Sequence, residues 1–300
     1  MRLSRVSRIV TIAASVALAT ALTACGQQAD LGGSSGSGPQ VAQDAKFEAG
    51  TTMAKIAQAG TVRVGTKFDQ PLFGLKGLDG KPVGFDVEIA KIIAAKLGVP
   101  ADKITYTETP SKIREDVLAN GQVDYVVATY TINDKRKERV SFAGPYYVAG
   151  QDLMVKKDNT TITGPDSLKA ANARVCTVSG STPAKEIVKY VDPANVVLFD
   201  VYSKCADALS NGQVDVVTTD NVILTGLVEA SQGAFKLVGK PFTKEPYGIG
   251  IAKGDVKFCE FINKTLKEAE ADGSYAKAWD STVGKVQGAA PPLPPAGTCS

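Results

Sequence analysis

The segment LANGQVDYVVA occupies residues 118–128, and a close copy, LSNGQVDVVTT, occupies residues 209–219. Both contain Asn-Gly, a pair that stops a helix because glycine tolerates the left-handed conformation at a helix end. The Val- and Thr-rich residues that follow are typical of buried parallel strands. The sequence therefore predicts the same helix–turn–strand unit in each half of the chain.

The residues before each turn predict the helix of that unit. SKIREDVLA precedes the first turn and SKCADALS precedes the second, and both patterns are those of short amphipathic helices. Each begins with a serine, a residue that commonly caps a helix N-terminus. We therefore expect Ser111 and Ser203 to be the N-caps.

The remainder of the chain alternates between strand and helix patterns. Short apolar runs predict strands, and longer amphipathic patterns predict helices. The strands are expected over residues 62–66, 174–180 and 247–253, and the helices over residues 85–98, 181–191 and 257–283. This alternation is typical of α/β proteins with parallel sheets.

Composition excludes several functions. The formal net charge of +3 comes from three arginines in residues 1–24, and beyond them acidic and basic residues number 31 each. This balance gives no electrostatic argument for a nucleic-acid partner. The sequence has no histidine, which rules out Ser-His-Asp and Cys-His catalysis. It also lacks the G-x-x-x-x-G-K-[ST] motif of a nucleotide site.

The N-terminal region predicts export and anchoring. Residues 1–24 have the basic start, apolar run and small residues of a secretory signal peptide. LTAC (residues 22–25) resembles the bacterial lipobox, which implies a lipid on Cys25; the alternative is an ordinary signal peptide with an incidental cysteine. Residues 25–50 begin with a Gly-, Ser- and Gln-rich stretch and predict a flexible linker. We therefore expect a protein on the extracytoplasmic face of the bacterial cell membrane, anchored through Cys25.

Four cysteines remain beyond Cys25. In an exported protein they suggest two disulfides, and sequence alone allows three pairings. We favour the two pairs that join near neighbours, Cys176–Cys205 and Cys259–Cys299. The cysteine spacing matches no zinc site, so we expect no metal and no cofactor.

Polar residues follow both repeated strands. Thr129, Thr131 and Arg136 come after the first strand, and Thr219 and Asp220 end the second. Ligands of open α/β sheets bind beyond the carboxyl ends of the strands. One unit offers a cation and hydroxyls and the other offers an anion, which together complement the α-carboxylate and α-ammonium of a free amino acid.

GFDVEIAKIIAAKLG, NGQVDYVVATYTINDKRKERVSFAGPYY, VSGST and GQVDVVTTD, in this order, resemble the polar amino-acid-binding proteins of bacterial ABC importers. The resemblance runs from about residue 56 to residue 285. It implies a two-lobed, periplasmic-binding-protein-like α/β fold with two mainly parallel sheets joined by two hinge strands, at residues 147–150 and 245–248. Lobe 1 would comprise residues 51–146 and 248–285, lobe 2 residues 147–247, and a Pro-rich tail residues 286–300.

The resemblance also implies a set of ligand-binding residues. Arg136 would clamp the α-carboxylate with two parallel hydrogen bonds, and Asp220 would hold the α-ammonium. The supporting donors and hydroxyls would be Thr129, Thr131, Ser181 and Thr182. A purely structural interpretation makes Arg136 a surface arginine and Asp220 a helix N-cap.

Side-chain selectivity is expected at other positions. Ser111 and Arg114, spaced S-x-x-R, resemble the members that bind glutamate and aspartate, and Lys67 lies where those members carry a basic residue. Two buried cations would favour an anionic side chain, because an unpaired buried charge is costly. If Asp69 points inward instead and Lys67 points outward, a neutral or basic amino acid becomes the expected ligand.

The sequence thus predicts a monomeric, non-enzymatic binding protein that captures L-glutamate or L-aspartate and delivers it to an ABC permease in the membrane. The alternatives are a glutamine/asparagine or basic amino-acid binding protein, and a ligand sensor for a membrane receptor. An enzyme that uses a lone carboxyl group as an acid is a further possibility.

Overall fold

The computed structural model describes residues 38–300. The predicted signal peptide and Cys25 lie outside the described residues. Within residues 38–300, none of the helices combines the length and the apolar character that a membrane crossing requires. The described part has two five-stranded sheets and a small three-stranded sheet.

The first large sheet forms the centre of lobe 1. Its strands lie in the order β5-β1-β6-β13-β7. β1 pairs in parallel with β5 and β6, while β13 pairs antiparallel with β6 and β7. The bounds are β1 (Val62–Thr66), β5 (Ile104–Glu108), β6 (Tyr125–Val126), β7 (Val140–Ala149) and β13 (Glu245–Ala252). The small sheet consists of β2 (Asp69–Gln70), β3 (Gly74–Lys76) and β4 (Pro82–Val83).

Seven α-helices and one 3₁₀-helix belong to this lobe within the described residues. They are α1 (Thr52–Ala59), α2 (Phe85–Lys96), η1 (Ala101–Lys103), α3 (Arg114–Ala119), α4 (Asp134–Lys137), α9 (Val256–Ala271), α10 (Ser274–Asp280) and α11 (Gly284–Gln287). The buried ring of Phe85 packs edge-on against Trp279 and Tyr275, with ring centroids 5.2 and 5.6 Å apart. Burial of these large rings contributes strongly to the core, because each removes much apolar area from water.

Lobe 2 repeats this plan. Its strands lie in the order β10-β9-β11-β8-β12, with β9 parallel to β10 and β11, and with β8 antiparallel to β11 and β12. The strands are β8 (Gln151–Lys156), β9 (Val175–Val178), β10 (Val196–Phe199), β11 (Val216–Asp220) and β12 (Phe235–Leu237). The helices are α5 (Ser167–Ala170), α6 (Thr182–Glu186), η2 (Ile187–Lys189), η3 (Pro193–Asn195), α7 (Tyr202–Ser210) and α8 (Asn221–Ala230).

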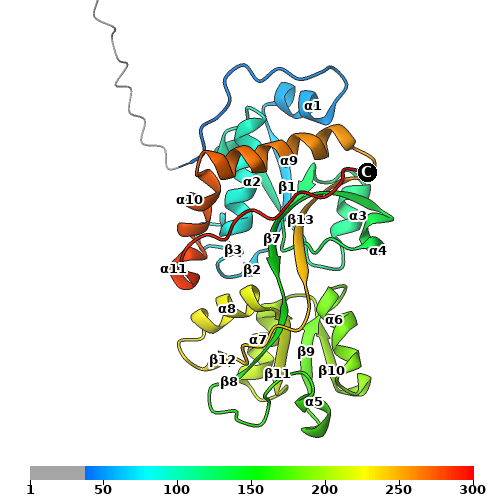
Figure 1. Ribbon diagram of the computed structural model, residues 1–300, viewed down its shortest axis with the longest axis vertical. Coiled ribbons are helices and arrows are strands. Elements are labelled where there is room, and N and C mark those ends of the chain that lie inside the picture. The colour runs from blue at the N-terminus through cyan, green and yellow to red at the C-terminus, as the bar shows by residue number, and fades with distance from the viewer. Residues whose placement is uncertain (1–37) are drawn as a thin grey trace, which may run out of the picture. The chain divides into compact units, whose positions relative to one another are not determined.

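Two antiparallel strands connect the lobes, as expected. β7 and β13 pair from Val140↔Ala252 to Ala149↔Glu245, and β8 begins immediately after β7. Figure 1 shows β7 and β13 running side by side from the first sheet toward the second. β13 is antiparallel to its neighbours in the first sheet and β8 is antiparallel to its neighbours in the second, so both sheets are mixed.

In each lobe, the repeated NGQVD turn is hydrogen-bonded to an arginine at the start of a strand. In lobe 1, Asp124 accepts hydrogen bonds from the backbone N–H and the guanidinium of Arg63, and Arg63 Nη1 donates to the Gly121 carbonyl oxygen. In lobe 2, Asp215 accepts the same pair from Arg174, which also donates to the Gly212 carbonyl oxygen.

Each of these sets of hydrogen bonds joins the start of one strand to the turn that leads into the neighbouring strand. The two glycines have φ values of 63° and 73°, in the left-handed region that favours this residue. The repeat therefore fixes the amino end of a strand, so that the strand's carboxyl end can present polar groups elsewhere.

The two predicted serine N-caps are wrong. α3 begins at Arg114 with Ile113 as its N-cap, so Ser111 lies in the preceding turn. α7 begins at Tyr202, one residue before Ser203, and its N-cap Val201 supplies no side-chain hydrogen bond. The sequence pattern locates both helices but places their starts incorrectly, since the groups that contact these two serines come from other segments.

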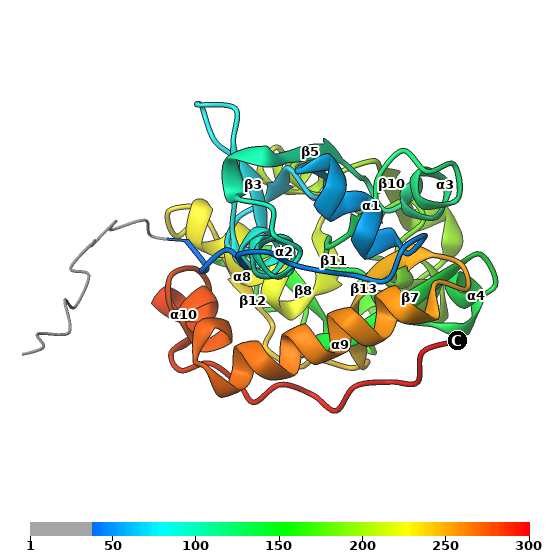
Figure 2. The ribbon, with the colours of Figure 1, turned by 90° about the horizontal axis from the view of Figure 1, so that it is seen from above.

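Residues 38–50, the second half of the expected flexible linker over residues 25–50, pack against lobe 1. Within residues 38–50, the Ala42 amide donates to the Ala95 carbonyl oxygen at 2.9 Å, and Phe47 packs edge-on against Phe261 of α9 at 5.4 Å. Figure 2 shows this segment crossing over α2 before it turns back into α1. Apolar residues such as Phe47 give this part of the segment a surface to pack against.

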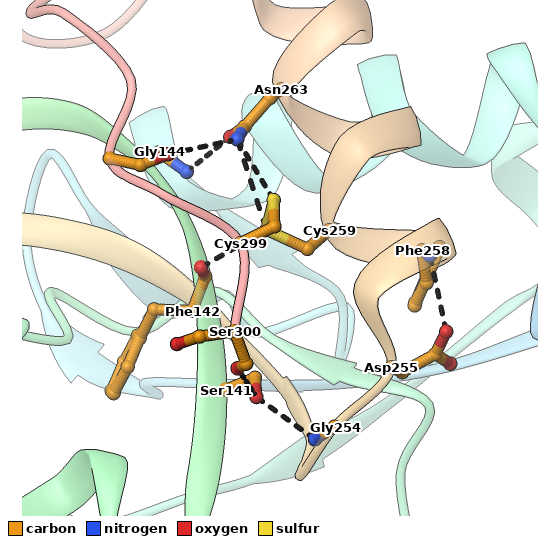
Figure 3. Close-up of a disulfide and its surroundings, with 11 residues drawn as sticks. Ser141, Phe142, Gly144, Gly254, Asp255, Phe258, Cys259, Asn263, Cys299 and Ser300 are labelled. Carbon is orange, nitrogen blue, oxygen red and sulfur yellow. Dashed lines mark hydrogen bonds between the residues drawn. A yellow bond between two sulfur atoms is a disulfide. The ribbon is translucent and has the colours of Figure 1, made fainter.

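Both favoured disulfides are present, Cys176–Cys205 and Cys259–Cys299, with Cα–Cα distances of 5.6 and 5.7 Å. The second fastens the C-terminal tail to α9 (Figure 3). Beside it, Gly297 N–H donates to the Gly144 carbonyl oxygen at 2.7 Å, and Ser141 Oγ donates to the Ser300 carbonyl oxygen at 2.5 Å. The Pro-rich tail is therefore held against lobe 1 over its last residues.

Replacing both Cys259 and Cys299 with serine is expected to lower the free energy of unfolding by about 2–4 kcal/mol. The disulfide closes a loop with a sequence separation of 40 residues, so its loss increases the entropy of the unfolded chain. Urea unfolding followed by circular dichroism measures the effect. Each single serine variant is the control and should lose about as much as the double variant. A double variant within 0.5 kcal/mol of the original chain would contradict the prediction.

Candidate functional site

The candidate site lies where carboxyl ends of strands from both lobes meet. Lys67 follows β1 and Thr129 follows β6 in lobe 1, while Ser181 and Thr182 open α6 after β9, and Asp220 ends β11 in lobe 2. All nine predicted ligand-binding residues except the half-buried Thr182 are at most 5% exposed. Burial of so many polar side chains in one region requires partners for them.

Arg136 connects the two lobes. Its Nη1 donates to the Thr131 carbonyl oxygen at 2.7 Å, its Nη2 donates to the Gly180 carbonyl oxygen of lobe 2 at 3.3 Å, and its Nε lies 3.2 Å from Glu115 Oε1. Burial lowers the pKa of this guanidinium to about 10, with the nearby charge of Arg114 as a second cause. Arg136 is thus a buried side chain and not a surface arginine.

Arg114 is held inside lobe 1. Its Nη1 donates to the carbonyl oxygens of Ala128 at 2.8 Å and Thr129 at 3.4 Å, and its guanidinium lies over the Tyr130 ring, 4.2 Å from the centroid. Its Nε is buried without a hydrogen-bond partner among residues 38–300. Arg114 is therefore only partly satisfied by the protein.

Lys67 is 1% exposed, and its Nζ donates to Ser111 Oγ at 3.2 Å. Burial, with the positive charge of Arg114 as a second cause, lowers the pKa of Lys67 to about 8. Ser111 thus serves as a partner of Lys67, which explains why it does not cap α3. No acidic side chain of the described region forms a salt bridge with Lys67.

Asp220 provides negative charge from lobe 2. Its Oδ2 accepts a hydrogen bond from the Tyr247 hydroxyl at 2.6 Å, while its Oδ1 is buried with no partner in the described part of the chain. Burial raises the pKa of Asp220 to about 7, and the nearby charge of Glu245 contributes in the same direction. Asp220 occupies the N-cap position of α8 but makes no side-chain capping bond, so its carboxylate is directed elsewhere.

Thr131 and Thr182 meet across the lobes. Their hydroxyl oxygens are 3.5 Å apart, and Thr182 Oγ1 also donates to Glu245 Oε2 at 2.8 Å. Ser181 is the N-cap of α6, and its hydroxyl accepts from the Ala184 amide at 3.1 Å. The structure therefore brings the predicted hydroxyl residues of the two lobes to one boundary.

Two buried acids of this region, Asp86 and Glu245, are not predicted from the sequence. Asp86 is fully buried and accepts from the Thr129 amide at 2.8 Å and the Tyr146 hydroxyl at 2.5 Å. Thr129 has a φ of 45°, a conformation that Asp86 helps to hold. Glu245 lies on β13 and is 4% exposed. Neither acid has a distinctive motif, because each acts through a neighbour that is distant in the chain.

Two α/β lobes joined by a pair of strands, with buried charged groups between them, define the two-lobed, periplasmic-binding-protein-like class of folds. The family model described as bacterial extracellular solute-binding proteins, family 3, matches residues 62–284. The chain belongs to this family, so the resemblance inferred from the motifs is confirmed.

The glutamate-binding protein GluB of Corynebacterium efficiens is 37% identical over 247 residues, covering 79% of this chain and 84% of that protein. The ABC transporter glutamine-binding protein GlnH of Bacillus subtilis is 39% identical over 252 residues, covering 84% and 90%. Among solved structures, an ancestral arginine-binding protein bound to glutamine has 38% identity and a TM-score of 0.70, covering 75% of this chain and 98% of the other. These similar proteins differ in the amino acid that they are named for.

Proposed function

We propose that this protein binds a free amino acid, L-glutamate or L-aspartate, between its lobes and delivers it to an ABC importer. In this proposal Arg136 and the hydroxyls of Thr131 and Thr182 receive the α-carboxylate, and Asp220 receives the α-ammonium. The partnerless Oδ1 of Asp220 supports the second role, because a buried carboxylate oxygen favours a hydrogen-bond donor. The names of the relatives GluB and GlnH support an amino acid as the ligand.

The preference for an acidic side chain rests on one observation, the environment of Lys67. This lysine is buried, and its only hydrogen-bond partner within residues 38–300 is the uncharged Ser111. The charge of Asp69 is near enough to raise the pKa of Lys67, but Asp69 forms no salt bridge with it and directs Oδ2 to the backbone of α7. A ligand carboxylate would supply the missing negative charge, whereas an amide would leave the lysine uncompensated.

Glutamine or asparagine is the second candidate ligand. Gln70 Nε2 and Gln151 Oε1 are buried without partners in the described region, and such groups can pair with a side-chain amide. The names of GlnH and of the glutamine-bound ancestral protein favour the same alternative.

Calorimetric titration of the purified full chain tests the proposal directly. L-Glutamate, L-aspartate, L-glutamine, L-asparagine and L-arginine are titrated separately at pH 7. We expect the two acidic amino acids to bind tightest. Tighter binding of glutamine would replace the acidic assignment, and binding of none of the five would overturn the amino-acid function.

Replacing Lys67 with glutamine is expected to weaken L-glutamate binding by about 1.5–3 kcal/mol while leaving L-glutamine binding within about 0.5 kcal/mol. The substitution removes the cation but keeps a donor of similar length. Lys103→Gln, at an exposed lysine on η1, is the matched control and should bind both ligands normally. An equal loss for the two ligands would contradict a role for Lys67 in selectivity.

The placement outside the cytoplasm agrees with the family description, and we further propose a lipid anchor on Cys25. The proposed hinges are residues 147–150 and 245–248, within or next to the paired strands β7 and β13. Fractionation of cells that express Cys25→Ser tests the anchor: release of the variant into the soluble extracytoplasmic fraction is expected, and retention in the membrane would contradict it.

A further inference from the structure

A short segment of lobe 1, Asp69–Pro71, contacts two helices of lobe 2. It contains strand β2 and the proline that follows it, and it belongs to the small sheet that packs on α2. β2 lies against α7 and α8 in the structure, and Figure 1 shows it beside α8. The segment is adjacent to Lys67 but makes contacts of a different kind.

Asp69 caps α7 from the opposite lobe. Its Oδ2 accepts hydrogen bonds from the Tyr202 amide at 2.7 Å and the Ser203 amide at 3.4 Å. These are first-turn amides, which no residue of the helix itself can satisfy. The helix's own N-cap, Val201, has no side-chain acceptor, so the cap for α7 is complete only when the lobes are together.

Pro71 sits against a glycine in the middle of α8. A Cβ atom added to Gly226 would overlap the Pro71 carbonyl oxygen and lie 3.0 Å from its carbonyl carbon. Glycine within a helix destabilises it relative to alanine, so a helix interior normally disfavours this residue. The absent side chain lets the Pro71 backbone approach α8 closely.

We propose that Asp69–Pro71 is an interlobe latch that sets the closing equilibrium of the protein. The inference rests on the proposed function, because closing matters only if a ligand is held between the lobes. The apparent dissociation constant equals the intrinsic constant divided by the fraction of closed protein. Loss of the latch therefore lowers the affinity for every ligand by the same factor and leaves the ranking of ligands unchanged.

Gly226→Ala is the first test. The new methyl group obstructs Pro71 in the closed arrangement, while alanine favours the helix within lobe 2. We expect the affinity for every amino acid that binds to fall by the same factor, about tenfold or more. The unfolding temperature should be unchanged or higher. Small-angle X-ray scattering without ligand should give a larger radius of gyration for the variant than for the original chain, because a smaller fraction of the variant is closed. The exposed position Glu229 on the same helix provides the control, Glu229→Ala, with no expected change.

Asp69 gives a pair of variants that separates capping from ligand recognition. Asp69→Ala removes the acceptor and should lower the affinity for all ligands by about fivefold, the usual effect of losing an N-cap. Asp69→Asn keeps a side-chain oxygen that caps helices well and should stay within about twofold of the original chain. A change in the ranking of ligands with either variant would instead place Asp69 in ligand recognition and overturn the latch.

Hydrogen exchange at the Tyr202 amide distinguishes failure of the latch from failure of the proposed function. The Asp69 cap protects this amide, so exchange should be about fivefold faster or more in Asp69→Ala, whichever ligand the protein binds. Equal exchange in the variant and the original chain would overturn the latch. Binding of none of the five amino acids, together with faster exchange in the variant, would overturn only the proposed function.

Discussion

Arg136→Ala is expected to weaken binding of the preferred amino acid by about 2–5 kcal/mol, the usual loss when one partner of a buried charge pair is truncated. Arg136 is 5% exposed and reaches the Gly180 carbonyl oxygen of the other lobe, so it lies at the boundary where we place the α-carboxylate. Its planar guanidinium can form two parallel hydrogen bonds with a carboxylate. Calorimetric titration with L-glutamate measures the loss.

Two further variants serve as comparisons for that result. Arg136→Lys keeps the charge but not the fork of donors, so it should recover only part of the affinity. Arg139, three residues further on, is half-exposed and pairs with Asp116, and Arg139→Ala should bind normally. Thermal unfolding is followed in parallel, because removal of Arg136 also leaves Glu115 without its ion pair. Near-normal affinity of a folded Arg136→Ala protein would remove this arginine from the site.

Asp220→Asn is expected to have opposite effects on binding and on stability. Amino-acid affinity should fall by about 2–5 kcal/mol, because the amide lacks the charge that would pair with the α-ammonium. The shape of the side chain and an oxygen for the Tyr247 hydroxyl are kept, so local packing should persist. Titration with L-glutamate measures the first effect.

The stability effect follows from the raised pKa of Asp220. Burial raises this pKa from 3.8 to about 7 in the folded protein. Between about pH 4 and pH 7 the folded state therefore binds more protons than the unfolded state, and the contribution of Asp220 to stability falls as pH rises. Asparagine does not titrate, so the variant should become more stable than the original chain above pH 7, by about 2–4 kcal/mol without ligand.

Urea unfolding at pH 4.5 and pH 8 measures this difference, since only the higher pH should show the full advantage of Asp220→Asn. Asp207→Asn, at an exposed position on α7, should show no such pH dependence. Equal stability of the Asp220→Asn variant and the original chain at both pH values would contradict burial of a charged Asp220. A carboxylate that is buried in order to bind a ligand destabilises the protein when the ligand is absent.

Local patterns were sufficient for much of the fold. Strand 62–66 is observed as β1 (Val62–Thr66), and the predicted helix over residues 85–98 is observed as α2 (Phe85–Lys96). The repeated NGQVD turn correctly indicated the same helix–turn–strand unit in each half of the chain, because glycine in the left-handed region and the following apolar run act over a few residues. Helix starts were less predictable: α7 is capped by Asp69, which lies 133 residues before Tyr202.

The site was predictable to the extent that it follows strand ends. Asp220 ends β11, Thr131 follows β6 and Arg136 lies on α4 beyond it, and all three are buried at the lobe boundary. Their partners were not predictable, since Glu115, Gly180 and Tyr247 reach them only through the fold. The role of Asp69 could not be assigned from its position two residues after Lys67, because side chains two residues apart share a face only within one regular strand, and Lys67 lies between β1 and β2.

The sequence by itself determined the α/β pattern with its repeated unit and the favoured pairing of the four cysteines, because these depend on local periodicity and spacing along the chain. Its motifs also determined the likeness to amino-acid-binding proteins, and that likeness implied the two lobes. Only the tertiary structure decided which charges meet. Lys67 turns to Ser111, Asp69 to the amides of α7, and Asp220 to Tyr247. Such contacts join residues far apart in sequence, and burial, which depends on the whole fold, sets both their strength and their pKa values.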